Sequence, residues 1–132
     1  MLVFLLLIMF FIADPCSKCS CDFIDFESSC VPEASGIYKK MTYQVNNFEA
    51  YFSENHDFAI WFCNEDSVWM VGSSSNIGKC LGLLYLRSYQ EDLSCFSCLV
   101  KSGTFWYFTN KWPRHRKCYS ETIVSCLGEG KK

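Results

Sequence analysis

Cysteine is the residue type whose number and spacing could do the most chemistry in this chain of 132 residues. The ten cysteines are Cys16, Cys19, Cys21, Cys30, Cys63, Cys80, Cys95, Cys98, Cys118 and Cys126. Ten is an even number, which in an exported chain predicts up to five disulfides and few or no free thiols. The spacing leaves the connectivity open, and we favour Cys21 with Cys30, and Cys126 with either Cys95 or Cys98.

Zinc binding is the alternative chemistry for these cysteines. Cys16-Ser-Lys-Cys19 and Cys95-Phe-Ser-Cys98 have the C-x-x-C spacing of a four-cysteine zinc site. About 75 residues separate the two pairs, however, whereas about 15–20 is usual in such a site. We therefore expect disulfides, and neither a metal nor another cofactor.

The charge distribution points to a second kind of chemistry, anion binding. The net charge of −2 hides an acidic first half, with three bases against ten acids in residues 1–66, and a basic second half, with nine bases against four acids. Four fixed positive charges fall in the seven residues 111–117. Arginine can grip a sulfate or a carboxylate with two parallel hydrogen bonds, and tryptophan can stack on a sugar ring. The candidate binding residues are Lys111, Trp112, Arg114, Arg116 and Lys117.

Catalytic chemistry has little support in the sequence. A Cys–His pair of His56 and Cys63 needs a thiolate, which a disulfide at Cys63 would remove. The acids Asp57, Glu65 and Asp66 are explained by turn composition as well as by paired carboxylates or calcium ligands. The segment from Gly72 to Cys80 lacks the spacing and the hydroxyl of a phosphate-binding loop. We therefore expect no catalytic residue and no enzymatic activity.

Short aromatic and β-branched runs must position these residues. Four runs at 36–41, 48–52, 58–63 and 68–72 are separated by Asn- and Asp-rich turns, which predicts an antiparallel meander. Three further strands are expected at 81–88, 104–108 and 122–126. In this scheme, residues 111–117 form an exposed connection. The predicted fold is an all-β, disulfide-stabilised antiparallel sandwich or barrel of about seven short strands.

The ends of the chain differ in composition from this β-rich part. Residues 1–13 are uncharged and almost entirely apolar, too short a run to span a bilayer, and are typical of a signal peptide. We expect a cysteine-rich loop arm at 14–35, the β-rich module at 36–126 and a flexible tail at 127–132. The mature protein would then begin near Asp14 and be secreted without a stable membrane span.

The order of Gly, Tyr and Trp over about residues 35–126 resembles a small extracellular β-module that recurs in invertebrate and marine proteins. The matching positions are Gly36, Tyr38, Asn46, Tyr51, Ile60-Trp61-Phe62, Trp69, Val71-Gly72, Trp106, Trp112 and Cys126. The chain departs from that pattern in its Asn46-Asn47-Phe48-Glu49 turn and in its extra cysteines. The resemblance implies an interaction module with no transferable catalytic activity.

These observations favour a secreted binding module that recognises a polyanionic glycan or an acidic extracellular protein, and no nucleic acid. Two alternatives belong to other classes: a toxin-like or antimicrobial effector, and an extracellular hydrolase. The acidic net charge and the lack of a cationic amphipathic helix argue against the effector. A structural alternative for the basic cluster is protection of a hairpin against edge-to-edge aggregation.

Overall fold

The computed structural model describes residues 21–54, 57–88, 95–100, 103–108, 114–119 and 122–127. The predicted signal peptide, Cys16, Cys19, His56, Lys111 and Trp112 lie outside these ranges. The described strands are β1 (Phe23–Ser28), β2 (Gly36–Val45), β3 (Phe48–Ser53), β4 (Phe58–Cys63), β5 (Val68–Ser73), β6 (Leu84–Arg87), β7 (Thr104–Phe108), β8 (His115–Lys117) and β9 (Thr122–Leu127). The helical turns are η1 (Pro32–Ala34), η2 (Ser74–Asn76) and α2 (Phe96–Leu99).

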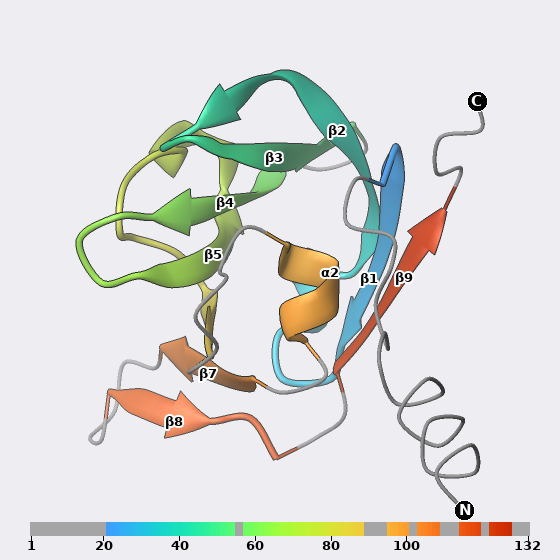
Figure 1. Cartoon of the computed structure of the whole chain (residues 1–132). Helices are drawn as coiled ribbons and strands as arrows, with labels where there is room; N and C mark the ends of the chain where they lie inside the picture. Colours follow the sequence, from blue (N-terminus) through green and yellow to red (C-terminus); the bar gives the residue numbers. More distant parts are fainter. Residues whose placement is uncertain are drawn as a thin grey trace, which may run out of the picture.

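All nine of these strands belong to one antiparallel sheet with the order β8-β7-β6-β5-β4-β3-β2-β1-β9. The sheet is curled into a half-barrel, with α2 inside the curl and β8 and β9 as its two edges (Figure 1). The predicted all-β, disulfide-stabilised antiparallel fold is confirmed, in the form of one curled sheet.

The meander follows the predicted turn chemistry. Asn46 and Asn47 join β2 to β3 with φ of 54° and 74°, the left-handed conformations that a tight hairpin requires and that Asn tolerates. The Asn46 side-chain amide also donates to Phe62 O at 2.6 Å and to Gly78 O at 3.3 Å. This turn therefore holds the meander and the segment after β5 together.

Apolar side chains cover both faces of the central strands. The concave face holds Phe26, Tyr38, Trp69 and Leu84, against which α2 packs Phe96 and Leu99. The convex face holds a second cluster around Trp61, Met70 and Tyr85, which Ile77 and Cys80 cover from the segment after β5. Trp61 and Trp69 are 0% and 1% exposed and belong to the core, whereas Trp106 is only partly buried.

The strand boundaries correct the sequence prediction in three places. The expected loop arm contains β1, whose Ile24 and Phe26 face the core in strict alternation with more exposed residues. The tail was expected to begin at residue 127, but β9 extends to Leu127, so the predicted boundary lies one residue too early. Part of the expected 111–117 connection is instead the strand β8, which pairs with β7.

Three described disulfides have a different connectivity from the one predicted. They join Cys21 to Cys126, Cys30 to Cys118 and Cys63 to Cys80. The Cys21–Cys30 pairing and the Cys126 pairing with Cys95 or Cys98 are wrong because β1 pairs along its whole length with β9, which places Cys126 beside the start of β1.

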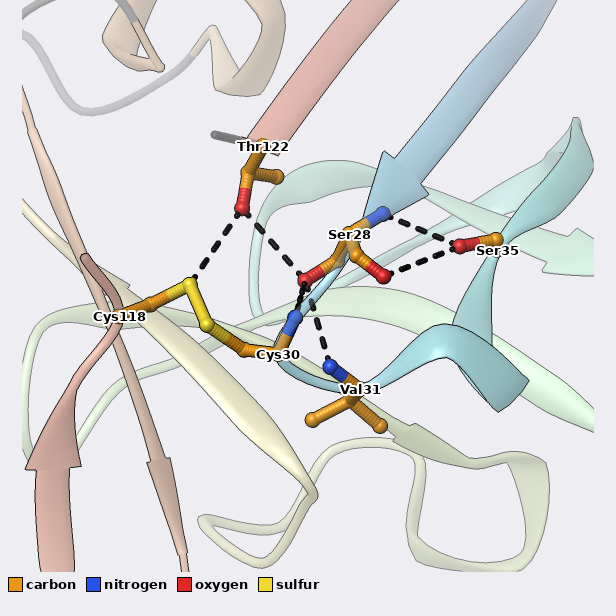
Figure 2. Close-up of a disulfide and its surroundings, with 6 residues drawn as sticks. All are labelled: Ser28, Cys30, Val31, Ser35, Cys118 and Thr122. Carbon is orange, nitrogen blue, oxygen red and sulfur yellow. Dashed lines mark hydrogen bonds between the residues drawn. A yellow bond between two sulfur atoms is a disulfide. The ribbon is translucent and has the colours of Figure 1, made fainter. Parts of the chain in front are cut away.

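The Cys30–Cys118 disulfide connects the edge strand β8, which Cys118 follows, to β1, which Cys30 follows and which lies beside the opposite edge strand β9. Figure 2 shows the hydrogen bonds around it. Ser28 Oγ accepts from the backbone N–H groups of Cys30 and Val31 at 3.2 and 3.5 Å, and Thr122 Oγ1 donates to Ser28 Oγ at 3.5 Å. This network satisfies polar groups where β1, β9 and the disulfide meet.

Cys95 is the one free cysteine among the described residues, within the expected few free thiols, although it was expected to take part in a disulfide. It is a buried free thiol whose Sγ lies 3.0 Å from Cys98 Sγ. Cys98 is itself disulfide-bonded, which explains why the two neighbours are not joined to each other. Among the described residues, no helix is both long and apolar enough to cross a membrane.

Candidate anion-binding surface

The described part of the predicted basic cluster lies at one edge of the sheet. Arg114 precedes β8, and Arg116 and Lys117 lie within it; all three side chains are exposed. Lys111 and Trp112 lie outside the described residues. Because β8 pairs only with β7 among the described strands, its outer backbone edge is presented at the end of the sheet, with four consecutive exposed side chains at 114–117.

The register with β7 assigns these side chains to two faces. Residues directly opposite each other in an antiparallel pair project to the same face. Lys117 is opposite Trp106 and His115 is opposite Phe108, so all four lie on the convex side, where Trp106 packs against the Trp61 cluster. Arg116 is opposite Tyr107, which packs against the concave core. The basic edge can therefore contact a ligand from either side.

Strand β6 extends the convex side of this surface. Tyr85 is opposite Trp106, and Arg87 lies two residues further along the same strand and hence on the same face. We call the resulting surface the aromatic–basic face, which consists of Tyr85, Arg87, Trp106, Phe108, His115 and Lys117. Sequence analysis identified only Lys117 among these residues as a binding candidate, because the others become neighbours through strand pairing.

His115 is held in place by two aromatic neighbours. Its Nδ1 lies 2.9 Å from the Tyr85 hydroxyl, and its ring centroid lies 4.6 Å from that of Phe108 in an edge-to-face arrangement. The Tyr85 and Phe108 ring centroids are 5.2 Å apart. The imidazole is thus positioned by the sheet while remaining exposed at its edge.

Two basic side chains of this region lie over aromatic rings. The Arg87 guanidinium carbon lies 5.9 Å from the Tyr85 ring centroid, and Lys117 Nζ lies 5.4 Å from the ring of Tyr119. Burial raises the pKa of Tyr85, an effect that the nearby Arg87 opposes and Asp66 reinforces. Tyr85 is therefore protonated at neutral pH, and its hydroxyl can form a hydrogen bond with His115 Nδ1.

The other chemistry considered from the sequence is limited by the disulfides. Cys63 is bonded to Cys80, so it cannot supply a thiolate to His56, as expected. Cys63, Asp66 and Cys80 form the one described group with metal-ligand proximity, but its two sulfurs are already joined to each other. The element that follows Cys80 is the strand β6, not the helix that follows a phosphate-binding loop.

Comparison of the chain with protein-family models, with curated proteins and with solved structures gives no match in any of the three.

Proposed function

We propose that this protein is an extracellular binding module that recognises a polyanion, in the first instance a sulfated glycan, through β8 and the aromatic–basic face. The observation that carries the proposal is the exposure of Arg114, His115, Arg116 and Lys117 in succession, opposite the aromatic residues of β7. Like charges this close repel one another and contribute no evident stability to the fold. A bound anion would neutralise them.

A sulfated glycan fits both the charges and the rings. Arginine pairs with sulfate through two parallel hydrogen bonds, and aromatic faces stack on the apolar faces of sugar rings. The three described disulfides support an oxidising, extracellular location, since such bonds rarely persist in the cytosol. Binding at an exposed surface of this kind should weaken steeply with salt, because charges are screened within about 8 Å at physiological ionic strength.

The test is retention on immobilised heparin, with affinity for a sulfated oligosaccharide measured by calorimetry. Arg114→Ala/Arg116→Ala should elute at lower salt than the wild type and bind about five- to thirtyfold more weakly, as expected for two partly screened charge contacts. Lys39→Ala/Lys79→Ala removes the same charge from exposed positions outside β8 and should leave binding nearly unchanged.

Circular dichroism must show that both double variants are folded. Equal elution of the wild type and the β8 variant would mean that the charges only protect an edge strand. Weak binding of the glycan together with strong binding of an acidic peptide would replace the glycan with an acidic protein as the partner.

A further inference from the structure

An apolar cavity opens beside the aromatic–basic face. Its volume is about 430 Å³, within the range of about 300–1,000 Å³ that is usual for small-molecule sites. Phe58, Leu81, Leu83 and Phe108 supply its apolar lining, and Ser73 and Asn76 supply polar groups. Phe108 belongs to both the cavity and the aromatic–basic face, so the two are continuous.

The walls of the cavity are fixed by contacts around the segment after β5. The Cys63–Cys80 disulfide and a hydrogen bond of 2.7 Å from Trp61 Nε1 to Lys79 O hold this segment against the convex face. A Cβ added to Gly72 would lie only 2.7 Å from Gly82 Cα, so the absence of side chains lets the two backbone stretches meet behind the cavity. The cavity is therefore formed before any ligand arrives, which lowers the entropy lost on binding.

Two large apolar side chains are exposed at this site. Leu81 is 57% exposed and Phe108 is 37% exposed, and both line the same cavity. Scattered exposed apolar residues need no explanation, but residues gathered around a preformed hollow are typical of a binding site. Their arrangement favours a ligand with an apolar chain.

Arg87 and His115 lie next to the Phe108 wall, together with the acid Asp66. The Phe108 ring contacts His115, and the adjoining recess of about 60 Å³ brings together Phe108, His115, Arg87 and Asp66. Lys117 is on the same face. Of the residues that line the 430 Å³ cavity, none carries a charge, so an apolar chain could fill it while a head group of negative charge reached Arg87 and His115 in the adjoining recess.

We propose that this cavity binds a free single-chain amphiphilic anion, with its alkyl chain against Leu81 and Phe108 and its carboxylate or sulfate head group at Arg87 and His115. The proposal rests on the proposed function in that the same aromatic–basic face supplies the contacts to the anion. It adds a class of ligand, a fatty-acid-like molecule, that the charged edge alone does not specify.

The experiment is calorimetric titration of the folded protein with decanoate and dodecanoate below their micellar concentrations. Two added methylenes should tighten binding about tenfold if the chain is buried in the cavity. Neutral 1-dodecanol should bind about tenfold more weakly than dodecanoate, because it loses the charge-assisted hydrogen bonds at the head group. Arg87→Gln should weaken the binding of dodecanoate but not that of dodecanol.

Leu81→Gln tests the cavity itself and should weaken dodecanoate about fivefold through lost apolar contact. Ile37→Gln is the matched control, since Ile37 is 42% exposed on β2 and does not line the cavity. Undetectable binding of dodecanoate, or equal affinities of the two variants, would overturn the proposal. Binding only to vesicles of anionic phospholipid would overturn it in favour of a membrane surface.

Heparin retention separates this proposal from the proposed function. Leu81→Gln leaves the charges of β8 in place and should elute from heparin with the wild type. If the protein does not bind dodecanoate but is retained normally on heparin, only the proposed cavity ligand is contradicted. If it binds dodecanoate but is not retained on heparin, only the proposed glycan binding is contradicted.

Discussion

The Cys30–Cys118 disulfide should stabilise the protein much less than its long sequence separation suggests. In the chain-entropy model, an isolated cross-link over its separation of 88 residues would contribute about 4.6 kcal/mol. The Cys21–Cys126 disulfide encloses it with a separation of 105. With that outer bond intact, the path from Cys30 to Cys118 through the outer disulfide is only 105 − 88 = 17 residues long.

The double variant Cys30→Ala/Cys118→Ala should therefore lose about 3 kcal/mol of unfolding free energy, the value for a loop of about 17 residues. The Cys63–Cys80 disulfide provides a matched comparison, because its own separation is also 17. Cys63→Ala/Cys80→Ala should lose about 3 kcal/mol from chain entropy, and about 1 kcal/mol more because the Cys63 sulfur is buried.

Urea unfolding followed by tryptophan fluorescence and by circular dichroism measures both losses by linear extrapolation. The expected result is that the Cys30–Cys118 variant is no less stable than the Cys63–Cys80 variant. If it is instead less stable by about 0.5 kcal/mol or more, as a loss of about 4.6 kcal/mol against one of about 4 kcal/mol would give, the outer disulfide does not shorten the loop, and the nested arrangement of cross-links is refuted.

Three further predictions concern single residues. Trp61→Phe should lose about 1–3 kcal/mol of unfolding free energy, because Lys79 O would lose the N–H that reaches it at 2.7 Å; an unchanged urea midpoint would refute this. Burial raises the pKa of Tyr38, so the stability that its protonated form provides is fully present below its unfolded pKa of about 10 and is lost at higher pH. Tyr38→Phe leaves Ala34 O without its donor and should be less stable than the wild type. The difference in unfolding free energy between the two should narrow above about pH 10, and a constant difference would contradict a raised pKa of Tyr38. Iodoacetamide added to the denatured, unreduced protein should label Cys95 but not Cys98, Cys118 or Cys126, as peptide mass spectrometry would show; unlabelled Cys95 would mean that it is oxidised.

The sequence predicted those strands that carry their own local signal. The runs Phe58–Cys63 and Thr104–Phe108 are rich in aromatic and β-branched residues, and both form strands with the expected bounds. Asn46-Asn47 was identified as a turn because these residues tolerate a left-handed backbone. In these segments, local preference and tertiary structure agree.

The remaining features depend on pairing between distant residues. His115–Lys117 has three charged or polar residues and no intrinsic strand preference, so only its pairing with β7 makes it a strand. Phe23–Ser28 has the period-two pattern of a strand, but its cysteine-rich surroundings favoured a loop in the sequence prediction. The pairing of this strand with β9 places Cys126 near Cys21, which explains the observed disulfide between them. Tyr85 and Phe108 joined the candidate site for the same reason, since they meet His115 only when β6, β7 and β8 are aligned.

The most direct test of the anion-binding proposal is amide chemical-shift mapping with a sulfated hexasaccharide at low and at physiological salt. The account predicts saturable shifts concentrated in β7 and β8 and at Arg87, which diminish as the salt concentration rises. It also predicts that Arg114→Ala/Arg116→Ala removes most of these shifts while the spectrum stays that of a folded protein. Shifts concentrated instead in β1 and β9, or no saturable shifts at β8, would contradict it.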